Sequence, residues 1–292
     1  MHVNDEVLFT LQWATMADLL HREIGRALKD SFGLTYLAFC LLASIRSHGG
    51  RMTLSEFPQG TLAKANTVAV AADRAEGRGY LEKRRCEADR RIVQVAETPA
   101  GGLVLEQGFE AIHARLCATA WKNHAQDDID ETMHDFPGVV RKLGIDPIEI
   151  NHRCHPVITP SYLMCIAGFL RRWEACTSRF ARLSFTEYRC LALLEHRLGS
   201  LSCAAIADEL VLDRSSVSPI VSRLARKGYV AVESGSDRRC HSVSPTDKGA
   251  VVAALATAEL EKVTAELFSD ASPSIKARAN ELHMRMYASY IA

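Results

Sequence analysis

The chain has 292 residues, more than one modest domain needs, and this length suits two domains of about 150 residues each. An apolar content of 48% supports packed cores and excludes a disordered chain, while sparse glycine and proline favour helices. Lysine plus arginine equals aspartate plus glutamate at 35 each, so the zero net charge argues against a dedicated nucleic-acid domain. Any affinity for DNA therefore has to come from local patches of positive charge on the surface.

The N-terminus does not resemble a secretory signal, because Asp5 and Glu6 stand where such a signal carries lysine or arginine. The longest apolar runs, such as residues 34–45, are shorter than the roughly 20 residues that a membrane span requires. Nine cysteines without a CxxC pair are typical of reduced thiols. We therefore expect a soluble, cytoplasmic protein that does not enter a membrane.

Helical periodicity dominates the first half of the chain. The predicted elements are helices over residues 5–31, 35–48, 66–79, 100–124 and 127–135, and strands over residues 80–84 and 92–96. Pro58 and Gly60 predict that the helix before residue 66 is short or irregular. Asn66 and Thr67 are good capping residues for the helix that follows, and Pro99 suits the start of the long helix after the hairpin.

The second half repeats this plan after a segment rich in proline and glycine. Its predicted elements are helices over residues 162–181 and 187–198, a helix-turn-helix over 202–227, a hairpin over 229–243, and helices over 247–268 and 274–290. Residues 137–160 lack strong periodicity and are interpreted as a linker. The predicted domains are therefore residues 1–136 and 161–292, joined by residues 137–160.

Four anchor segments recur in the same order in both halves. The paired segments and their spacings are Leu34–Thr35 with Phe185–Thr186 at 151 residues, Gly79–Leu81 with Gly228–Val230 at 149, Asp89–Arg91 with Asp237–Arg239 at 148, and Thr98–Gly101 with Thr246–Gly249 at 148. A drift of only three residues across four ordered anchors predicts an internal duplication.

The order of helices, helix-turn-helix, Asp-Arg-Arg hairpin tip and a Thr-x-x-Gly helix start resembles the MarR family of bacterial transcription regulators. Residues 184–255 are the closer match, and the first half has a poorer helix-turn-helix. The resemblance implies a mainly α fold with small β-wings (α+β), dimerisation through the terminal helices, and an effector pocket between those helices and the DNA-binding lobe. Two tandem winged helix-turn-helix copies would then form an intramolecular pseudo-dimer. The implied function is that of a transcriptional repressor, whose partners are an operator in double-stranded DNA and a small aromatic or lipophilic effector.

The second copy has the richer set of candidate DNA contacts. Its candidates are Arg214, Ser215, Ser216, Ser218, Arg223, Arg238 and Arg239. The serines are short donors that suit base edges or phosphates, and Asp213 suits the cap of the recognition helix. The wing arginines suit the minor groove. Pro219 lies about six residues inside this helix, so the helix either starts near Ser216 or bends at the proline.

The first copy offers fewer donors, because alanines occupy much of its recognition helix. Its candidates are Lys64, Asn66, Thr67 and Arg74 on that helix and Arg90 and Arg91 on the wing, which also carries Lys83, Arg84 and Arg85. We hypothesise that the first copy grips the DNA backbone while the second supplies most base recognition, which predicts an asymmetric operator.

Other constellations leave alternatives open. His152, Cys154 and His155 are soft metal ligands, but no second cluster at ligand spacing accompanies them, so we expect no metal site. Cys86 and Cys240 lie near the wing arginines, where a thiol switch is one reading and incidental cysteines the other. His113 and Cys117 are more simply explained as a buried core pair. Trp13, Trp121 and Trp173 would either line an effector pocket or, more simply, pack in the core.

No nucleophile motif, phosphate-cradling GxxxxGKS/T loop or HExxH pair occurs, so we expect neither an enzyme nor a bound cofactor. The competing class of function is a sensor or protein-interaction module that has kept the fold and lost specific DNA binding. The neutral pI and the alanine-rich first recognition helix favour that alternative.

Overall fold

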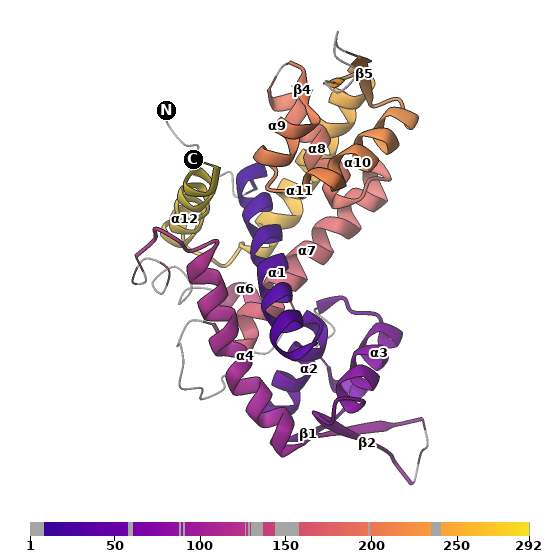
Figure 1. Ribbon diagram of the computed structural model, residues 1–292, viewed down its shortest axis with the longest axis vertical. Coiled ribbons are helices and arrows are strands. Elements are labelled where there is room, and N and C mark those ends of the chain that lie inside the picture. Colours follow the sequence, from indigo (N-terminus) through magenta and orange to yellow (C-terminus); the bar gives the residue numbers. More distant parts are fainter. Residues whose placement is uncertain are drawn as a thin grey trace. The chain divides into compact units, whose positions relative to one another are not determined.

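The computed structural model describes residues 9–57, 61–87, 89, 91–125, 127, 129, 137–143, 158–197, 199–234 and 241–291. The chain divides into two compact units. Unit 1 comprises Met1–Asp18 and Leu170–Ala292, and unit 2 comprises Leu19–Phe169. Helix α1 (Leu11–Phe32) and helix α7 (Pro160–Ala181) therefore each contribute one part to each unit (Figure 1).

Unit 2 places helices around one small sheet. Its remaining elements are α2 (Tyr36–Ser47), β1 (Arg51–Thr53), the 3-10 helix η1 (Leu54–Glu56), α3 (Ala65–Glu76), β2 (Leu81–Arg85), β3 (Val93–Glu97), α4 (Pro99–Ala118) and α6 (Pro137–Lys142). The three strands are antiparallel in the order β1-β3-β2, with Val95 of the central strand opposite both Met52 and Lys83. Phe39 and Phe109 pack edge to face in the core, with ring centroids 5.1 Å apart.

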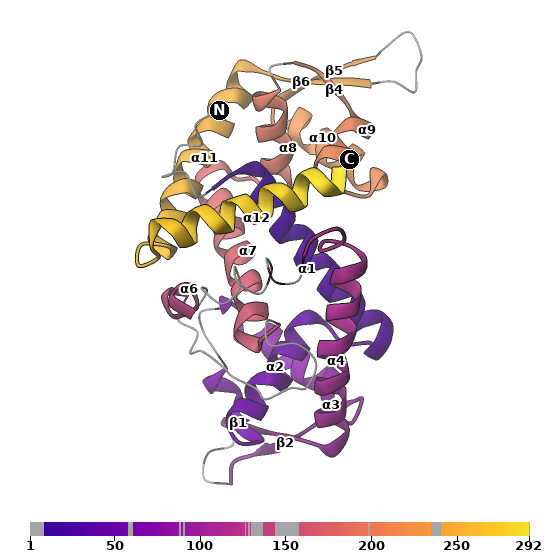
Figure 2. The same cartoon turned by 90° about the vertical axis from the view of Figure 1, so that its left-hand side faces the viewer.

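Unit 1 repeats this order of elements. After α7 come α8 (Phe185–His196), β4 (Leu201–Ser202), α9 (Cys203–Glu209), α10 (Arg214–Arg226), β5 (Val230–Ser234), β6 (His241–Pro245), α11 (Asp247–Leu267) and α12 (Pro273–Ile291). Its strands are antiparallel in the order β4-β6-β5, the same arrangement as in unit 2 (Figure 2). A helix, a short strand, two helices and a hairpin around such a sheet form a winged helix-turn-helix, so each unit has a mainly helical fold with a small antiparallel sheet.

Each hairpin is fixed to the following long helix by the same contacts. Thr98 caps α4 by accepting a hydrogen bond from the Gly101 amide, and its hydroxyl donates to the Gly79 carbonyl at 2.6 Å. Thr246 does the same for α11, with its hydroxyl 2.8 Å from the Gly228 carbonyl oxygen. A Cβ atom on Gly101 or Gly249 would lie 1.9 or 2.0 Å from the carbonyl oxygen of the tyrosine that opens the hairpin, so only glycine fits there.

The recurring geometry corrects the spacing of the first anchor. Thr35 caps α2 and Ser184 caps α8, and these residues are 149 positions apart. The same spacing relates the backbone bonds that close the preceding helices, from the Leu34 amide to the Leu28 carbonyl and from the Leu183 amide to the Thr177 carbonyl. The spacing of 151 residues taken from the sequence was wrong by two, because it matched the threonines at 35 and 186 and not the cap positions.

Several predicted helix boundaries were also wrong. Helix α1 begins at Leu11, where the Thr10 hydroxyl accepts a hydrogen bond from the Trp13 amide at 3.1 Å. Helix α4 ends at Ala118 and not near residue 124, because the Thr119 hydroxyl donates to a carbonyl of the last turn and the chain leaves the helical path. The predicted linker contains the short helix α6. In the stretch before α3, where the sequence predicted a short or irregular helix, η1 is the only helical turn among the described residues.

An aromatic cluster forms the core of unit 1. Trp13 lies edge to face against Trp173 and Phe268, with centroids 5.3 and 5.6 Å away, and Trp173 donates to the Thr264 hydroxyl at 3.1 Å. His283 completes the cluster at 5.6 Å from Trp13, and burial lowers the pKa of its imidazole to about 4. The tryptophans are therefore core residues, as the simpler reading predicted.

No single helix of the described chain has both the length and the apolar character needed to cross a membrane. Helices α1 and α2 meet that criterion only when joined, and an 81° bend separates them.

Val211 adopts an unfavourable backbone conformation in the turn between α9 and α10. Its φ is +52°, a left-handed value that costs a β-branched residue about 1–2 kcal/mol. We expect Val211→Gly to raise the free energy of unfolding by about 1 kcal/mol, because the relief of strain exceeds the added chain entropy. Ala204→Gly, at an exposed position of α9, is the control and should lower the same quantity by about 1 kcal/mol in urea unfolding. Equal losses in both variants would contradict this account.

Candidate nucleic-acid interface

Helix α10 is built as the second helix of a helix-turn-helix. Ser202 caps α9 by accepting from the Ala205 amide at 3.1 Å, and the Leu212 amide closes the turn by donating to the Ala207 carbonyl at 2.8 Å. One face of α10 is apolar and buried in the lobe, formed by Val217, Ile220, Val221 and Leu224. The opposite face is therefore held outward on a rigid element.

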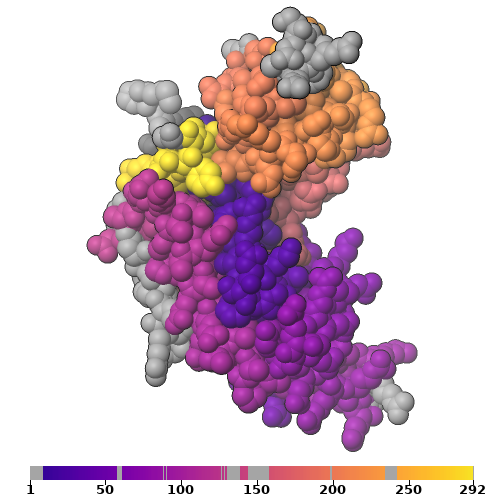
Figure 3. Space-filling model, viewed as in Figure 1, coloured from indigo at the N-terminus to yellow at the C-terminus, as the bar shows by residue number. Residues whose placement is uncertain are grey.

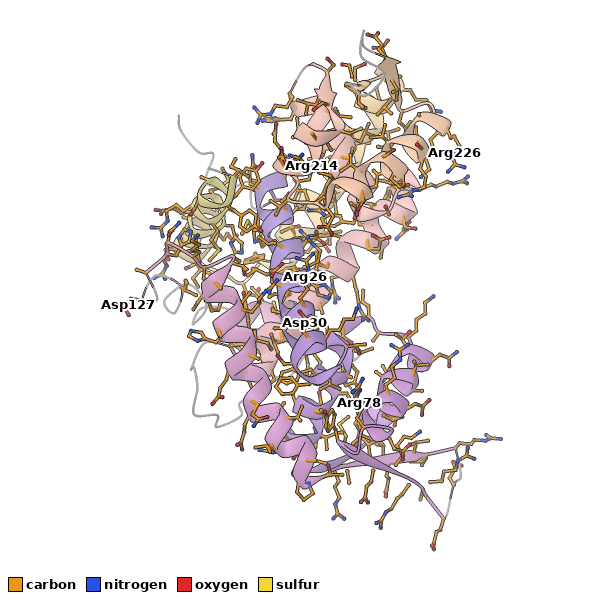
Figure 4. All side chains as sticks on the ribbon, in the orientation of Figure 1. Arg26, Asp30, Arg78, Asp127, Arg214 and Arg226 are labelled. Carbon is orange, nitrogen blue, oxygen red and sulfur yellow. The ribbon has the colours of Figure 1, made fainter. Side chains whose placement is uncertain are left out.

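The outward face of α10 is a polar stripe. Exposed side chains recur at helical spacing and are Arg214, Ser215, Ser218, Pro219, Ser222 and Arg226, with Ser216 exposed beside them. Arg214 and Arg226 lie at the two ends of the helix (Figure 4), and the α9–α10 region belongs to the visible surface (orange in Figure 3). The structure thus brings four predicted site residues together and adds Ser222 and Arg226 to them. The sequence already indicated Arg226, with Lys227, as suited to phosphates where the chain leaves the groove. Ser222 was not predicted, and its spacing of four residues from Ser218 was the signal that could have found it.

The start of α10 decides between two open alternatives and contradicts one prediction. The helix begins at Arg214, which excludes a start near Ser216, and Pro219 lies inside it. Asp213 occupies the N-cap position, but its side chain makes no capping hydrogen bond. Because proline has no N–H, the carbonyl of Ser215 lacks its usual helical partner. This carbonyl belongs to the exposed part of the stripe, where α10 carries no acidic side chain.

Arg223 does not join the stripe. Its guanidinium Nε donates to Oε1 of buried Glu187 on α8 at 2.6 Å, and the Lys227 ammonium donates to the other carboxylate oxygen at 2.8 Å. Burial opposes ionisation of Glu187, but the hydrogen bonds from Lys227 and Arg223 outweigh it and hold the pKa of the carboxyl below its usual value. Glu187 therefore ties the end of α10 to α8.

We expect Glu187→Gln to lower the free energy of unfolding by about 2 kcal/mol at pH 7, the typical worth of hydrogen bonds to a charged group. Since the folded-state pKa is depressed, this contribution is complete above the unfolded pKa of about 4.3 and is lost as the pH falls through the folded value. Urea unfolding at several pH values should show the two proteins converging in acid. Glu233→Gln, at an exposed wing position, is the control. A difference that stays constant with pH would refute the assignment.

The corresponding helix of unit 2 presents a different surface. Lys64, Asn66, Thr67 and Arg74 are all exposed, as the site prediction requires. Helix α3 begins at Ala65 with Lys64 as its N-cap and no side-chain capping bond, so the predicted caps Asn66 and Thr67 lie inside the helix. Val70 is 48% exposed on the same helix. An apolar side chain in this place gives α3 less capacity for polar base contacts than α10.

The wing of unit 2 keeps part of its predicted basic character. Lys83 is engaged by Asp73 and Glu76 of α3, whereas Arg84, Arg85 and Arg91 are exposed, with Arg84 3.3 Å from the exposed carboxylate of Glu82 on the same strand. The ion pair fixes the base of the wing to α3. Three predicted site residues lie outside the described residues, namely Arg90, Arg238 and Arg239.

The remaining candidates form no metal-binding cluster among the described residues. The Cys117 sulfur lies 3.4 Å from His113 Nε2, but Cys117 is exposed, so the expectation of a buried core pair was wrong. Cys86 is half-buried, and Trp121 is buried like the other tryptophans. Across the described part of the chain, no three potential metal ligands come together. The metal and thiol candidates His152, Cys154, His155 and Cys240 lie outside the described residues.

Comparison with solved structures finds proteins that resemble part of the chain. The transcriptional regulator BldR from Sulfolobus solfataricus is 22% identical over 40% of this chain and 86% of its own, with a TM-score of 0.36. A MarR-family regulator from Rhodococcus sp. RHA1 is 16% identical over 44% of this chain and 90% of its own, with a TM-score of 0.40. Bordetella bronchiseptica BpsR, whose DNA binding is regulated by 6-hydroxynicotinic acid, is 19% identical over 40% and 92%, with a TM-score of 0.36.

No curated protein sequence matches the chain significantly. A family model does match, and its match covers α8, α9, α10 and β5, the elements that build and carry the polar stripe. Residues 183–239 match the model of the MarR family.

Proposed function

We propose that the chain is a transcriptional regulator of MarR type that binds duplex DNA by placing α10 in the major groove. The observation that carries this proposal is the outward stripe of α10, where serines and arginines gather on a helix that itself carries no acidic residue and lies inside the segment that matches the family. Arg214 also lies 3.6 Å from the exposed carboxylate of Asp208 on α9. Serine and arginine suit both base edges and phosphates. The hairpins would lie beside the groove, with arginines in the minor groove. We extend the proposal to repression and to control by a small aromatic or lipophilic effector, as the family match suggests.

We also propose that the two units are tandem copies of one fold that act as an intramolecular pseudo-dimer. The identical strand order, the matching threonine caps and the paired glycine contacts support a duplication. Leu62 and Val211, 149 residues apart, even share the left-handed conformation, with φ of +51° and +52°. Linkage of two copies raises their effective concentration to the millimolar range.

The two copies would have different roles in DNA binding, because their recognition helices α10 and α3 expose different side chains. Helix α10 offers serines and arginines, whereas α3 exposes Val70 and places its polar residues near its ends. We propose that unit 1 supplies base recognition and that unit 2 grips the backbone, through Arg84, Arg85 and Arg91 above all. The preferred operator would then be asymmetric.

Binding-site selection from random duplexes tests the proposal. The expected result is one stringent half-site, with affinity that falls steeply as salt rises because phosphate contacts release counterions. Arg214→Ala should relax specificity at one position and cost about 1–3 kcal/mol of discrimination. Lys262→Gln, far along α11, is the matched control and should leave specificity unchanged. A perfectly palindromic consensus would contradict the division of labour, and the absence of salt-dependent binding would contradict DNA recognition itself.

A specific observation favours one alternative function for unit 2. Leu62 and Val70 are 46% and 48% exposed at the start and on the outer face of its helix-turn-helix. Such side chains suit a protein partner better than a phosphate backbone. In this case, the chain would be a sensor or interaction module, and replacing Arg84 and Arg91 by glutamine would leave any DNA affinity unchanged.

A further inference from the structure

Four exposed cations gather in unit 1 where α7 and α10 end and α11 begins. This basic corner consists of Arg179, Arg182, Arg226 and Lys248. Lys227 connects the three segments, because its ammonium donates to the Arg182 carbonyl at 2.9 Å and its own carbonyl accepts from the Lys248 ammonium at 3.1 Å. The corner is thus a built feature of the lobe and not a chance meeting of long side chains.

The cations of the basic corner differ from other surface cations of unit 1. Arg197 is paired with Glu209 at 2.6 Å and Lys262 with Glu259 at 2.6 Å. None of the four corner residues forms an ion pair with a carboxylate in the part of the chain that the structure describes. The buried carboxylate of Glu187 is already engaged by Arg223 and Lys227. Exposed Asp247 lies beside Lys248, so the four cations outnumber one acid and the corner carries net positive charge in a chain whose net charge is zero.

Helix dipoles explain only part of this arrangement. Cations near the C-termini of α7 and α10 stabilise those helices, which accounts for the arginines. Lys248, however, is the second residue of α11, at the end of a helix where a cation is disfavoured. Its ammonium is held there 5.0 Å above the Tyr229 ring. Stabilisation of α11 therefore does not explain why a lysine stands at position 248.

Unit 2 provides an internal comparison. The residues at the positions 149 or 148 places earlier are Asp30, Gly33, Gly77 and Ala100, so none of the four corner residues has a cationic counterpart and one counterpart is an acid. A cation is still present there, because the guanidinium of Arg78, the counterpart of Lys227, lies over Gly33. Figure 4 labels Asp30 near the end of α1 and Arg226 at the end of α10. Since unit 2 has the same order of elements without these charges, the fold does not need them. Their presence in unit 1 points to a ligand of opposite charge.

We propose that the basic corner binds phosphates of duplex DNA next to the groove that α10 enters. This inference rests on the proposed function and extends it to a second contact surface. Arg226 belongs both to the outward stripe of α10 and to the corner, so the two surfaces are continuous. The phosphates of the DNA backbone carry negative charge but no sequence information. They therefore match the arginines and the lysine of the corner, which have no side chains beside them on α7 or α11 that would read bases.

A triple variant tests the inference, with Arg226 left in place because it also lies on α10. Arg179→Gln/Arg182→Gln/Lys248→Gln should make the plot of log affinity against log salt shallower by about 2.7, since each of the three phosphate contacts contributes about 0.9. The selected consensus sequence should stay the same. The matched control is Lys262→Gln/Lys276→Gln/Arg285→Gln, which removes the same charge from α11 and α12 and should keep the slope.

A second measurement locates the contact. Methylphosphonate substitution, which neutralises single phosphates of the selected duplex, should weaken binding of the unaltered chain at flanking positions and have no effect there on the triple variant. A wild-type slope in the triple variant, with an unchanged urea midpoint, would overturn the inference and leave an acidic protein as the partner to test. If the unaltered chain bound no duplex in a salt-dependent way, the proposed function would fail as a whole.

Discussion

Replacing Asp18 by alanine is expected to lower the free energy of unfolding by about 3–5 kcal/mol, the usual cost of breaking a buried ion pair. Arg189 of α8 is completely buried, and its Nη2 donates to Asp18 Oδ2 of α1 at 2.7 Å. Its guanidinium also lies 5.6 Å from the Phe185 ring centroid. Loss of the carboxylate removes the anion that the buried guanidinium contacts at 2.7 Å, which is far more costly than the loss of a surface pair. Urea unfolding at pH 7 measures the effect.

Two further variants make this prediction specific. Asp18→Ala/Arg189→Met removes both charges, and because an apolar side chain of similar length fills the site, it should be more stable than Asp18→Ala alone. Glu259→Ala breaks the exposed Lys262 pair and should cost less than about 1 kcal/mol. A double variant no more stable than the single one would mean that Asp18 acts by something other than pairing with Arg189.

The Asp18–Arg189 pair also has a consequence for architecture. It fixes the start of α1 to α8, so residues 11–18 belong to the unit formed by the C-terminal part of the chain. The aromatic contacts of Trp13 with Trp173 and Phe268 also attach the start of α1 to this unit. The first helical turns of the chain therefore stabilise the lobe that carries α10.

The elements that sequence patterns predicted best are those decided by local chemistry. Both hairpins were predicted: β2 and β3 begin and end one residue after the expected strands, and β5 and β6 together lie within two residues of the expected hairpin over 229–243. Thr98 and Thr246 mark the starts of α4 and α11, because a threonine hydroxyl at the N-cap position accepts a hydrogen bond from the amide three residues later, here that of a glycine. In these places a few neighbouring residues determine the structure.

The predictions that failed depend on contacts between distant residues or on competition at helix ends. The pairing of Arg223 with Glu187 was not predicted, because these residues lie 36 positions apart on different helices, and the DNA contact of Arg223 stays a prediction. Asp213 and Asn66 have the composition of caps, yet in the structure neither makes a capping bond. The basic corner could not be predicted either, because its four cations come from three segments that meet only in the folded lobe.

Pro219→Ala is expected to raise the free energy of unfolding by about 2 kcal/mol. Proline inside a helix costs about 3 kcal/mol relative to alanine, and its restriction of the unfolded chain offsets up to about 1 kcal/mol of that penalty. The substitution gives the Ser215 carbonyl its hydrogen-bond partner at position 219. Val251→Ala, at an exposed position of α11, is the control and should change stability by less than about 0.5 kcal/mol.

The same substitution should weaken DNA recognition. Pro219 lies in the middle of the outward stripe, where the Ser215 carbonyl can accept a hydrogen bond from a base amino group because no helical N–H occupies it. We therefore expect Pro219→Ala to bind the selected duplex about tenfold more weakly and to accept more bases opposite Ser215, with an unchanged salt slope. A variant that gained stability and kept full specificity would show that the proline has no part in reading DNA. A stability gain with lost discrimination is the expected outcome, because strain that survives in a binding helix is retained for function.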